Sequence, residues 1–280
     1  IFKKENSSLL YLRGHIMTAW TPKKIKALKG KEKFATITAY DAITASIADT
    51  AGVPLILVGD SLGPTALGFE STVPVTMDIM VHHTKAVRRG CKNAVVVADM
   101  PFLSYQIDET EAIRNAGRFI QEAGADAVKL EGGGCRAKLI SKLVENGIPV
   151  MAHIGMLPQN IKQSGYAYKG KTEEEVASIM ADAKAVTEAG AFCVVIECAT
   201  SGLAEKITAS VDIPVIGIGA GAATDGQIIV ISDMLGMNGC KLPKFVKLYA
   251  NMREEAISAV KQYMGEVENG VFPSADNIYE

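Results

Sequence analysis

The chain of 280 residues has no long hydrophobic run, no large excess of charge of either sign and no closely paired cysteines. Its apolar stretches are far shorter than the roughly 18 to 20 residues that a membrane-spanning helix needs, which excludes such a helix. A net charge of -2 and scattered lysines and arginines argue against a nucleic acid or an anionic membrane as the partner. A small molecule is the expected partner.

The cysteines form an odd set without CxxC spacing, and we expect free thiols in a reducing, cytoplasmic compartment. They are Cys91, Cys135, Cys193, Cys198 and Cys240. Residues 1–16 contain a four-residue apolar core, too short for a secretory signal, and we expect them to be an extension that is not part of the native fold. Hydrophobic residues make up 48% of the chain, which is ample for one large domain over residues 17–280.

Eight apolar, β-branched runs recur along the chain, each followed by polar or glycine-rich residues. They are 34–40, 54–60, 93–99, 127–132, 148–154, 192–198, 213–219 and 227–232. Helical patterns fill most gaps, at 42–52, 77–90, 108–124, 136–147, 173–190 and 202–210. Nearly continuous apolar strands that alternate with helices are typical of a parallel sheet buried on both faces, and eight of them favour a closed (β/α)8 barrel of the α/β class.

The weakest link in this barrel lies between the seventh and eighth runs. Only "AGAATDG" separates them, fewer than the dozen or so residues that a crossover helix needs. After Leu235, apolar residues recur at three- and four-residue steps and predict one or two terminal helices that cover the barrel or a neighbouring subunit.

Charged residues gather where the strands end. Asp60 and Asp99 end the second and third runs, Lys129 and Glu131 lie in the fourth, and Glu197 lies in the sixth. The carboxyl ends of barrel strands are where active sites are assembled. We therefore expect these side chains to face one mouth.

Several carboxylates at one mouth need a compensating cation, because an unpaired buried charge costs several kcal/mol. Lys129 supplies only one positive charge. Oxygen ligands favour a hard ion, so Mg²⁺ is the simplest candidate and Zn²⁺ is less suitable. The alternative is that Asp60 and Asp99 only cap the helices or turns that follow them.

Glu197 and the histidines have other expected roles. Apolar neighbours in "VVIECAT" should raise the pKa of Glu197 and make it a usable base, unless it instead pairs with Lys129. His153 is either a buried histidine with satisfied hydrogen bonds or a donor to substrate. His82 and His83 lie on an expected helix without spaced partners, and solvent exposure is the default for both.

Two glycine-rich patterns have simple structural interpretations. "GIGAGAATDG" fits a dinucleotide-binding pattern, but no convincing helix follows, and we interpret it as a tight turn at the barrel mouth. "EGGGC" at 131–135 could cradle an anion at a helix start, but a sharp turn is the simpler interpretation.

Several motifs together resemble the 3-methyl-2-oxobutanoate (ketopantoate) hydroxymethyltransferase family. They include "FATITAYD", "LVGDSLG", "ADMPF", "VKLEGG", "HIGMLPQ", "IPVIGIGAG" and "PKFVKLYA", in order from about Lys33 to about Pro273. The resemblance implies a barrel of the phosphoenolpyruvate/pyruvate type, assembled as a homo-oligomer, commonly a decamer. It also implies transfer of a one-carbon unit from 5,10-methylenetetrahydrofolate to 3-methyl-2-oxobutanoate, which gives 2-dehydropantoate in pantothenate synthesis.

The same resemblance implies a role for each motif residue. Asp60 and Asp99 match Mg²⁺ ligands, and Glu131 matches an acid that supports the metal. Ser61 and Lys129 match groups that hold the ketoacid. Apart from the resemblance, we expect Asp60, Asp99 and His153 to contact the substrate as well. Glu197 matches the general base.

The chain departs from the family at residues 164–171, where "SGYAYKGK" stands in place of something like "GGYKVQGK". We expect this segment to lie over the barrel mouth, where the departure bears on folate affinity. "ECATSGLA" and Ser232–Asp233 also depart from the common pattern. Two other functions stay open: a Mg²⁺-dependent carbon–carbon or phosphorus–carbon lyase or mutase of the isocitrate lyase type, and a binding protein without catalysis. The cysteine-bearing loop expected of the lyases is not evident.

Overall fold

The computed structural model describes residues 19–239 and 241–279. Its eight parallel strands form a closed barrel in sequential order, and β1 pairs with β8. The strands are β1 Phe34–Thr38, β2 Leu55–Val58, β3 Val95–Asp99, β4 Ala127–Glu131, β5 Val150–Gly155, β6 Cys193–Glu197, β7 Val215–Ile218 and β8 Gly226–Ile229. All eight expected strands are present, and the barrel is confirmed. The expected extension at 1–16 and Cys240 lie outside the described residues.

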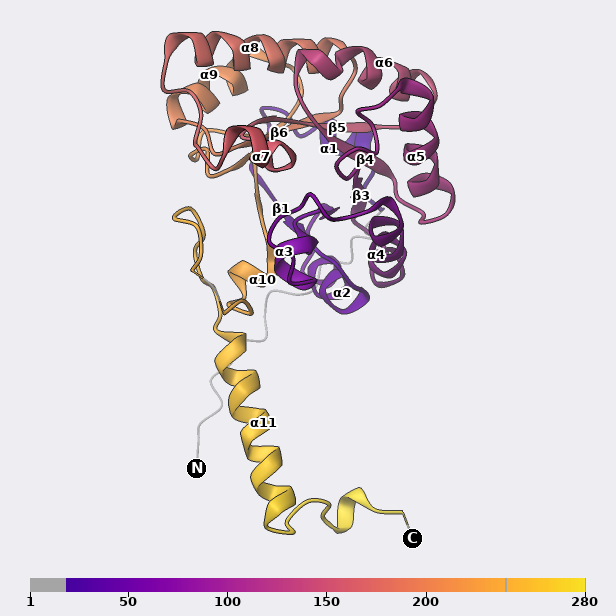
Figure 1. Ribbon diagram of the computed structural model, residues 1–280, viewed down its shortest axis with the longest axis vertical. Coiled ribbons are helices and arrows are strands. Elements are labelled where there is room, and N and C mark those ends of the chain that lie inside the picture. Colours follow the sequence, from indigo (N-terminus) through magenta and orange to yellow (C-terminus); the bar gives the residue numbers. More distant parts are fainter. Residues whose placement is uncertain (1–18, 240, 280) are drawn as a thin grey trace.

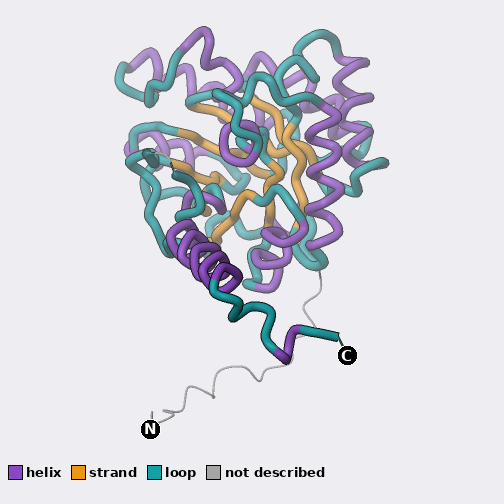
Figure 2. Tube along the Cα trace, turned by 60° about the horizontal axis from the view of Figure 1, so that its bottom comes forward, coloured by secondary structure: helices purple, strands orange, loops and turns teal. Residues whose placement is uncertain are grey.

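Helices surround most of the barrel, as Figures 1 and 2 show. They are α1 Pro22–Lys26, α2 Ala42–Thr50, α3 Leu62–Ala66, α4 Met77–Gly90, α5 Glu109–Gln121, α6 Ala137–Glu145, α7 Ile161–Ser164, α8 Glu173–Glu188, α9 Ser201–Ser210, α10 Ile231–Met234 and α11 Met252–Glu268. Side-chain caps begin several of them: Asp41, Thr76, Asp108 and Thr172 each accept a hydrogen bond from the backbone N–H three residues on. The six helices expected between strands are confirmed.

Alternation along each strand divides the core into two parts. Leu55 and Leu57 of β2 point into the barrel, whereas Ile56 and Val58 pack with the surrounding helices. Ile25 of α1 belongs to the inner cluster and is fully buried. Apolar side chains therefore fill the barrel, and its polar residues gather at the carboxyl ends of the strands.

The link between β7 and β8 contains no helix, and the short connection still closes the barrel. Gly217 and Gln227 are paired across the two strands, and Gly219 and Gly221 in the link have φ values of 61° and 82°. This left-handed backbone is accessible to glycine at little cost. The dinucleotide-like pattern is thus a turn.

The C-terminal segment was expected to cover either the barrel or a neighbouring subunit, and it does not cover the barrel. One helix, α11, forms, but none of its residues is buried, and Figure 1 shows it extending away from the barrel. Large apolar side chains on it are exposed, among them Val260, Tyr263 and Met264. Among the described residues, no helix has the length and apolar character needed to cross a membrane.

Candidate active site

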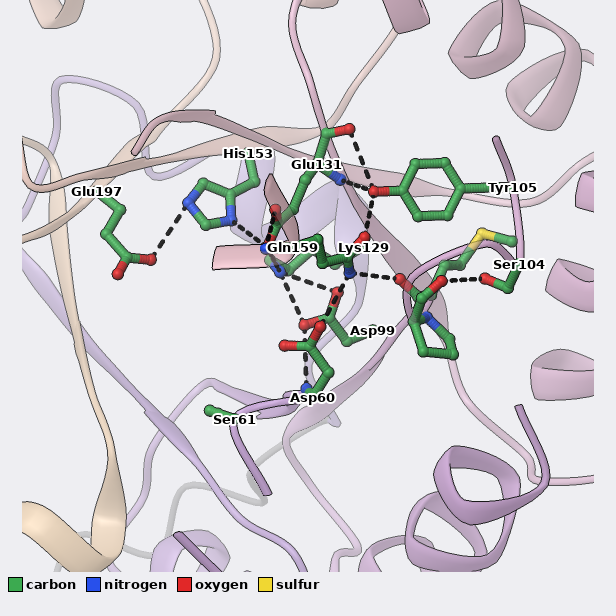
Figure 3. Close-up of polar contacts among 12 residues, drawn as sticks. Asp60, Ser61, Asp99, Ser104, Tyr105, Lys129, Glu131, His153, Gln159 and Glu197 are labelled. Carbon is green, nitrogen blue, oxygen red and sulfur yellow. Dashed lines mark hydrogen bonds and ion pairs between the residues drawn. The ribbon is translucent and has the colours of Figure 1, made fainter. Parts of the chain in front are cut away.

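The seven residues singled out from the sequence line one small cavity at the carboxyl ends of the strands. They are Asp60, Ser61, Asp99, Lys129, Glu131, His153 and Glu197. The cavity measures about 100 Å³, and Figure 3 shows the side chains converging from β3, β4, β5, β6 and the loop after β2. Neither Asp60 nor Asp99 is the N-cap of the next helix, since Ser61 begins α3 and Asp108 begins α5.

The Lys129 ammonium is the positive centre of the cavity. Its Nζ donates to both carboxylate oxygens of Asp99, at 2.9 and 2.7 Å, and lies 3.7 Å from Oε1 of Glu131. Burial disfavours the charged ammonium, but the Asp99 and Glu131 carboxylates outweigh that effect and raise the pKa of Lys129 above its ordinary value. Lys129 is therefore charged and paired, mainly with Asp99.

When Asp60 and Glu131 ionise, the cavity has an excess of negative charge. Both are buried, so that three carboxyl groups share one ammonium group. Burial and the neighbouring Asp99 raise the pKa of Asp60 well above its ordinary value, and burial raises the pKa of Glu131 to about 8 against the opposing effect of Lys129. Glu131 Oε1 also accepts no hydrogen bond from any of the described residues. The ionised site calls for one more cation.

Gln159, which the sequence analysis missed, joins the two excess carboxylates. Its side-chain Nε2 donates to Asp60 Oδ2 at 2.9 Å and to the carbonyl of Met100 at 2.9 Å, and its backbone N–H donates to Glu131 Oε2 at 3.1 Å. The hydroxyl of Tyr105 donates to Gln159 Oε1 at 2.7 Å. Gln159 lies in the quoted motif "HIGMLPQ", which is the signal that could have found it.

Ser61 is held by a second missed residue, Tyr40. The two hydroxyl groups lie 2.9 Å apart, and Thr38 donates to the Tyr40 hydroxyl at 3.0 Å. The backbone carbonyl of Tyr40 lies 2.6 Å from Nδ1 of His83. The expected exposure of His83 is therefore wrong: it is half-buried beside the loop after β1, whereas His82 is exposed.

Glu197 lies across the cavity from Asp99 and does not pair with Lys129. Its Oε2 is 3.3 Å from Nε2 of His153, whose pKa burial holds well below its ordinary value, so the imidazole is neutral. Burial raises the pKa of Glu197 to about 7. Such a carboxyl can both accept and return a proton near neutral pH.

The residue after Glu197 has an unusual backbone. Cys198 has a φ of 46°, which is uncommon for a residue with a side chain. Its N–H donates to the carbonyl of Ile218 at 2.8 Å, and its carbonyl accepts from the N–H of Lys169 at 2.8 Å. This backbone turns the chain out of β6 directly after the candidate base and ties the end of β6 to the loop before α8.

The "EGGGC" glycines do not surround a free anion. The N–H of Gly134 donates to Oδ1 of Asp182 at 2.8 Å, and a Cβ on Gly133 would lie 2.0 Å from that carboxylate. A side chain of the protein itself thus occupies this turn, consistent with the interpretation of a sharp turn.

Within residues 19–239 and 241–279, no group of three or more His, Cys, Asp or Glu side chains is arranged to hold a metal ion by itself. Lys129 bonds to both oxygens of Asp99, which explains part of this result. The donor chemistry still fits a hard ion, because the buried carboxyl groups of Asp60 and Glu131 share a single ammonium group with Asp99. Such an ion would need further oxygen ligands from substrate or water.

The sequence matches one protein family over nearly its whole length. The family described as ketopantoate hydroxymethyltransferase matches residues 19–275. A 3-methyl-2-oxobutanoate hydroxymethyltransferase of Syntrophus aciditrophicus (strain SB) is 53% identical over 261 residues, which are 92% of this chain and 96% of that protein. That of Carboxydothermus hydrogenoformans (strain ATCC BAA-161 / DSM 6008 / Z-2901) is 52% identical over 90% of this chain and 92% of the relative.

Solved structures share the fold at much lower identity. A phosphoenolpyruvate phosphomutase from Streptomyces platensis subsp. rosaceus has a TM-score of 0.59 at 16% identity and covers 93% of this chain and 92% of its own. A 2,3-dimethylmalate lyase of the PEP mutase/isocitrate lyase superfamily has a TM-score of 0.56 at 15% identity, with 92% and 91% covered. These structural similarities support the fold only. The reaction has to be inferred from the residues of the site.

Proposed function

Because this chain belongs to the ketopantoate hydroxymethyltransferase family, we propose that it uses Mg²⁺ and 5,10-methylenetetrahydrofolate to convert 3-methyl-2-oxobutanoate into 2-dehydropantoate. The observation that carries this proposal is the pairing of two unlike groups across one cavity. A carboxylate-rich wall around Lys129 faces Glu197, a half-buried carboxyl whose pKa is raised to about 7. One wall suits an anionic ketoacid with its cation, and the other suits removal of a proton.

Asp60 and Asp99 would hold the magnesium ion, and Glu131 would support it through bound water. The support for this assignment is the excess of carboxyl groups and the orphan oxygen of Glu131. When bound, the ion withdraws electron density from the keto group of the substrate and makes the neighbouring C3–H more acidic.

The remaining polar residues would orient the ketoacid. The Lys129 ammonium is within reach of an anion in the cavity and stays charged, so it can pair with the substrate carboxylate. The Ser61 hydroxyl, fixed by Tyr40, can donate a hydrogen bond to the same group. His153 is neutral and can donate one ring N–H to substrate without adding charge.

Glu197 would remove the C3 proton. Its raised pKa makes the carboxylate a stronger base than an exposed glutamate, and its position beside His153 keeps it at the cavity wall. The carbon nucleophile then attacks the methylene carbon of the folate. Both bonds from that carbon to nitrogen break, one replaced by the new carbon–carbon bond and the other by the hydroxyl oxygen that water supplies. The two folate nitrogens take up the two protons released from C3 and from water, which gives tetrahydrofolate.

Exchange of the C3 proton tests the base directly and needs no folate. In D₂O with Mg²⁺, the wild-type protein should exchange this proton of 3-methyl-2-oxobutanoate, and Glu197→Gln should slow the exchange about 10²- to 10⁴-fold. Glu188→Gln on the exposed part of α8 is the matched control. Normal exchange by Glu197→Gln would refute the assignment, and folate-independent turnover of another acid would refute the proposed reaction.

Titration with Mg²⁺ tests the ion without relying on turnover. Calorimetry on the wild-type protein with ketoacid present should show binding, and Asp60→Asn should weaken both Mg²⁺ and ketoacid. Equal affinity of Asp60→Asn for both would remove Asp60 from the ligand set.

We also propose a cytoplasmic homo-oligomer in which α11 contacts a second copy, a decamer if the family resemblance holds. The apolar side chains that α11 leaves exposed support a protein contact. Light scattering should give a mass well above that of one chain, and a truncation before Asn251 should reduce it; a monomeric wild-type protein would contradict this assembly.

A further inference from the structure

The cavity that contains Asp60, Asp99, Lys129 and Glu131 is called the carboxylate cavity below. We propose that a second cavity, which shares Glu197 with it, binds the ring system of the folate co-substrate. This inference rests on the proposed function and assigns the residues that recognise the one-carbon donor. The second cavity measures about 340 Å³ and is lined by Met156, Tyr166, Ala167, Tyr168, Glu197, Cys198, Pro243 and Phe245. The carboxylate cavity, at about 100 Å³, suits only the small ketoacid.

The shared residue makes the arrangement suitable for carbon transfer. Glu197 lines both cavities, so a donor in the second cavity lies beside the carbon from which Glu197 removes the proton. Bond formation requires the two reacting carbons to come within about 3 to 3.5 Å. Because both cavities are lined by one carboxylate, ligands in the two cavities would lie next to each other.

The lining of the second cavity favours a flat aromatic ligand over a second ketoacid. Its aromatic side chains come from two separate loops, Tyr166 and Tyr168 before α8 and Phe245 before α11. Tyr166 and Tyr168 are 71% and 56% exposed, which leaves their rings available for stacking. Apolar pockets of about 300 to 1,000 Å³ are typical of sites for small organic cofactors.

The loop that carries the tyrosines is anchored at the barrel mouth. The backbone of Lys169 makes two hydrogen bonds: its carbonyl accepts from the N–H of Thr200 at 3.0 Å, and its N–H donates to the carbonyl of Cys198 at 2.8 Å. Gly170 has a φ of 85°, and a Cβ there would lie 2.7 Å from Leu203. The close approach of this glycine holds Tyr168 near the end of β6, so the cavity wall exists before any ligand arrives.

Lysines at the rim of the second cavity are placed to pair with the anionic glutamate tail of a folate. Lys171 Nζ lies 4.0 Å from the centre of the Tyr168 ring, Lys169 follows Tyr168, and Lys244 lies between the lining residues Pro243 and Phe245. Glu175 accepts from the N–H groups of Gly170 and Lys171 and offsets one of these charges. The remaining positive charge suits the carboxylates of a glutamate tail beyond the rings.

Substitution of the tyrosines tests ring binding. In calorimetry with tetrahydrofolate, Tyr168→Ala and Tyr166→Ala should each weaken binding about tenfold, because each loses a ring that stacks on the ligand. Tyr168→Phe keeps the ring and should bind within twofold of wild type. Tyr279→Ala, at a fully exposed tyrosine, is the control and should bind as wild type does.

Steady-state kinetics give the second readout. Tyr168→Ala should raise KM for methylenetetrahydrofolate far more than KM for the ketoacid, whereas a merely misfolded variant would lose both together. Wild-type affinity in both alanine variants would overturn the assignment of this cavity and leave the proposed function standing. A wild-type protein that does not bind tetrahydrofolate would overturn the proposed folate reaction itself.

The lysines are tested by the length of the tail. Lys171→Gln with Lys244→Gln should weaken tetrahydrofolate carrying several glutamates more than tetrahydrofolate carrying one, and added salt should reduce the wild-type preference. Lys206→Gln, at an exposed lysine of α9, is the matched control. Equal loss for both ligands would remove the lysines from tail recognition.

Discussion

The two cavities that meet at Glu197 are built in different ways. The carboxylate cavity takes its side chains from strand ends, and Asp99, Lys129 and His153 are almost fully buried. The second cavity, called the aromatic cavity from here on, takes Tyr166, Tyr168 and Phe245 from loops, and all three are exposed. Strand ends are held by the sheet on both sides, so they can fix charged atoms for chemistry, whereas loops offer a surface that adapts to a large ligand.

Their electrostatics differ as well. In the carboxylate cavity, burial raises the pKa of Asp60 and of Glu131, and the neighbouring charges of Asp99 and Lys129 add to that shift or oppose it. The rim of the aromatic cavity carries lysines in contact with solvent, where interactions are weak and screened. Substitutions should therefore have large, coupled effects in the first cavity and small, separable effects in the second.

The largest effect is expected when the buried cation is removed. Lys129→Met leaves three buried carboxyl groups without their ammonium partner, and breaking a buried pair in this way costs about 3–5 kcal/mol. Urea unfolding should show this loss, and it should grow from pH 6 to pH 8 as the carboxyl groups ionise. Lys184→Met on the exposed face of α8 is the control, and an unchanged midpoint for Lys129→Met would break the comparison.

A smaller effect is expected at the residue that joins the two excess carboxylates. Gln159→Leu removes the hydrogen bond to Asp60 and the shorter of the two hydrogen bonds that the Tyr105 hydroxyl donates, which costs about 1–3 kcal/mol. Proton exchange should slow by about tenfold or more, while tetrahydrofolate affinity stays within twofold. Gln163→Leu, an exposed glutamine nearby, is the control. Equal losses of exchange and folate affinity would show that the cavities are not separable.

The pH dependence of exchange should report on Glu197. The carboxylate is the active form and its pKa is raised to about 7, so the rate should rise with pH up to about 7 and fall about tenfold per unit below that value. The affinity of the Tyr168→Phe variant for tetrahydrofolate is the control, because ligand binding in the second cavity needs no proton transfer to Glu197. An acidic limb with the ordinary pKa of an exposed glutamate would contradict the burial argument.

The smallest effect is expected from the hydroxyl that positions Ser61. Tyr40→Phe keeps the buried ring and removes a hydrogen bond of 2.9 Å to the Ser61 hydroxyl, which contributes about 0.5–1.5 kcal/mol. KM for the ketoacid should rise a few-fold with little change in the melting temperature. Tyr249→Phe, on an exposed ring outside both cavities, is the control. An unchanged KM would show that Ser61 needs no support.

Much of the fold and the carboxylate cavity could be predicted from the sequence. The apolar, β-branched runs predicted all eight strands. Because these strands are parallel and close into a barrel, the ends that carry Asp60, Asp99 and Glu197 meet at one mouth. Gln159, Tyr105 and Tyr40 were missed because neutral polar residues on loops resemble surface residues in a sequence. The exposure of His83 was wrong because its partner is the backbone carbonyl of Tyr40, which no side-chain pattern reveals.

The sequence by itself determined which residues carry charge at strand ends, because a parallel barrel turns the end of every strand to the same face. Only the tertiary structure decided how those charges pair: Lys129 with Asp99, and Glu197 beside a neutral His153. It also placed the loop of Tyr168 against the end of β6, next to the same glutamate. Pairing depends on distances of a few ångströms between segments far apart in the chain, and these distances exist only after the barrel closes.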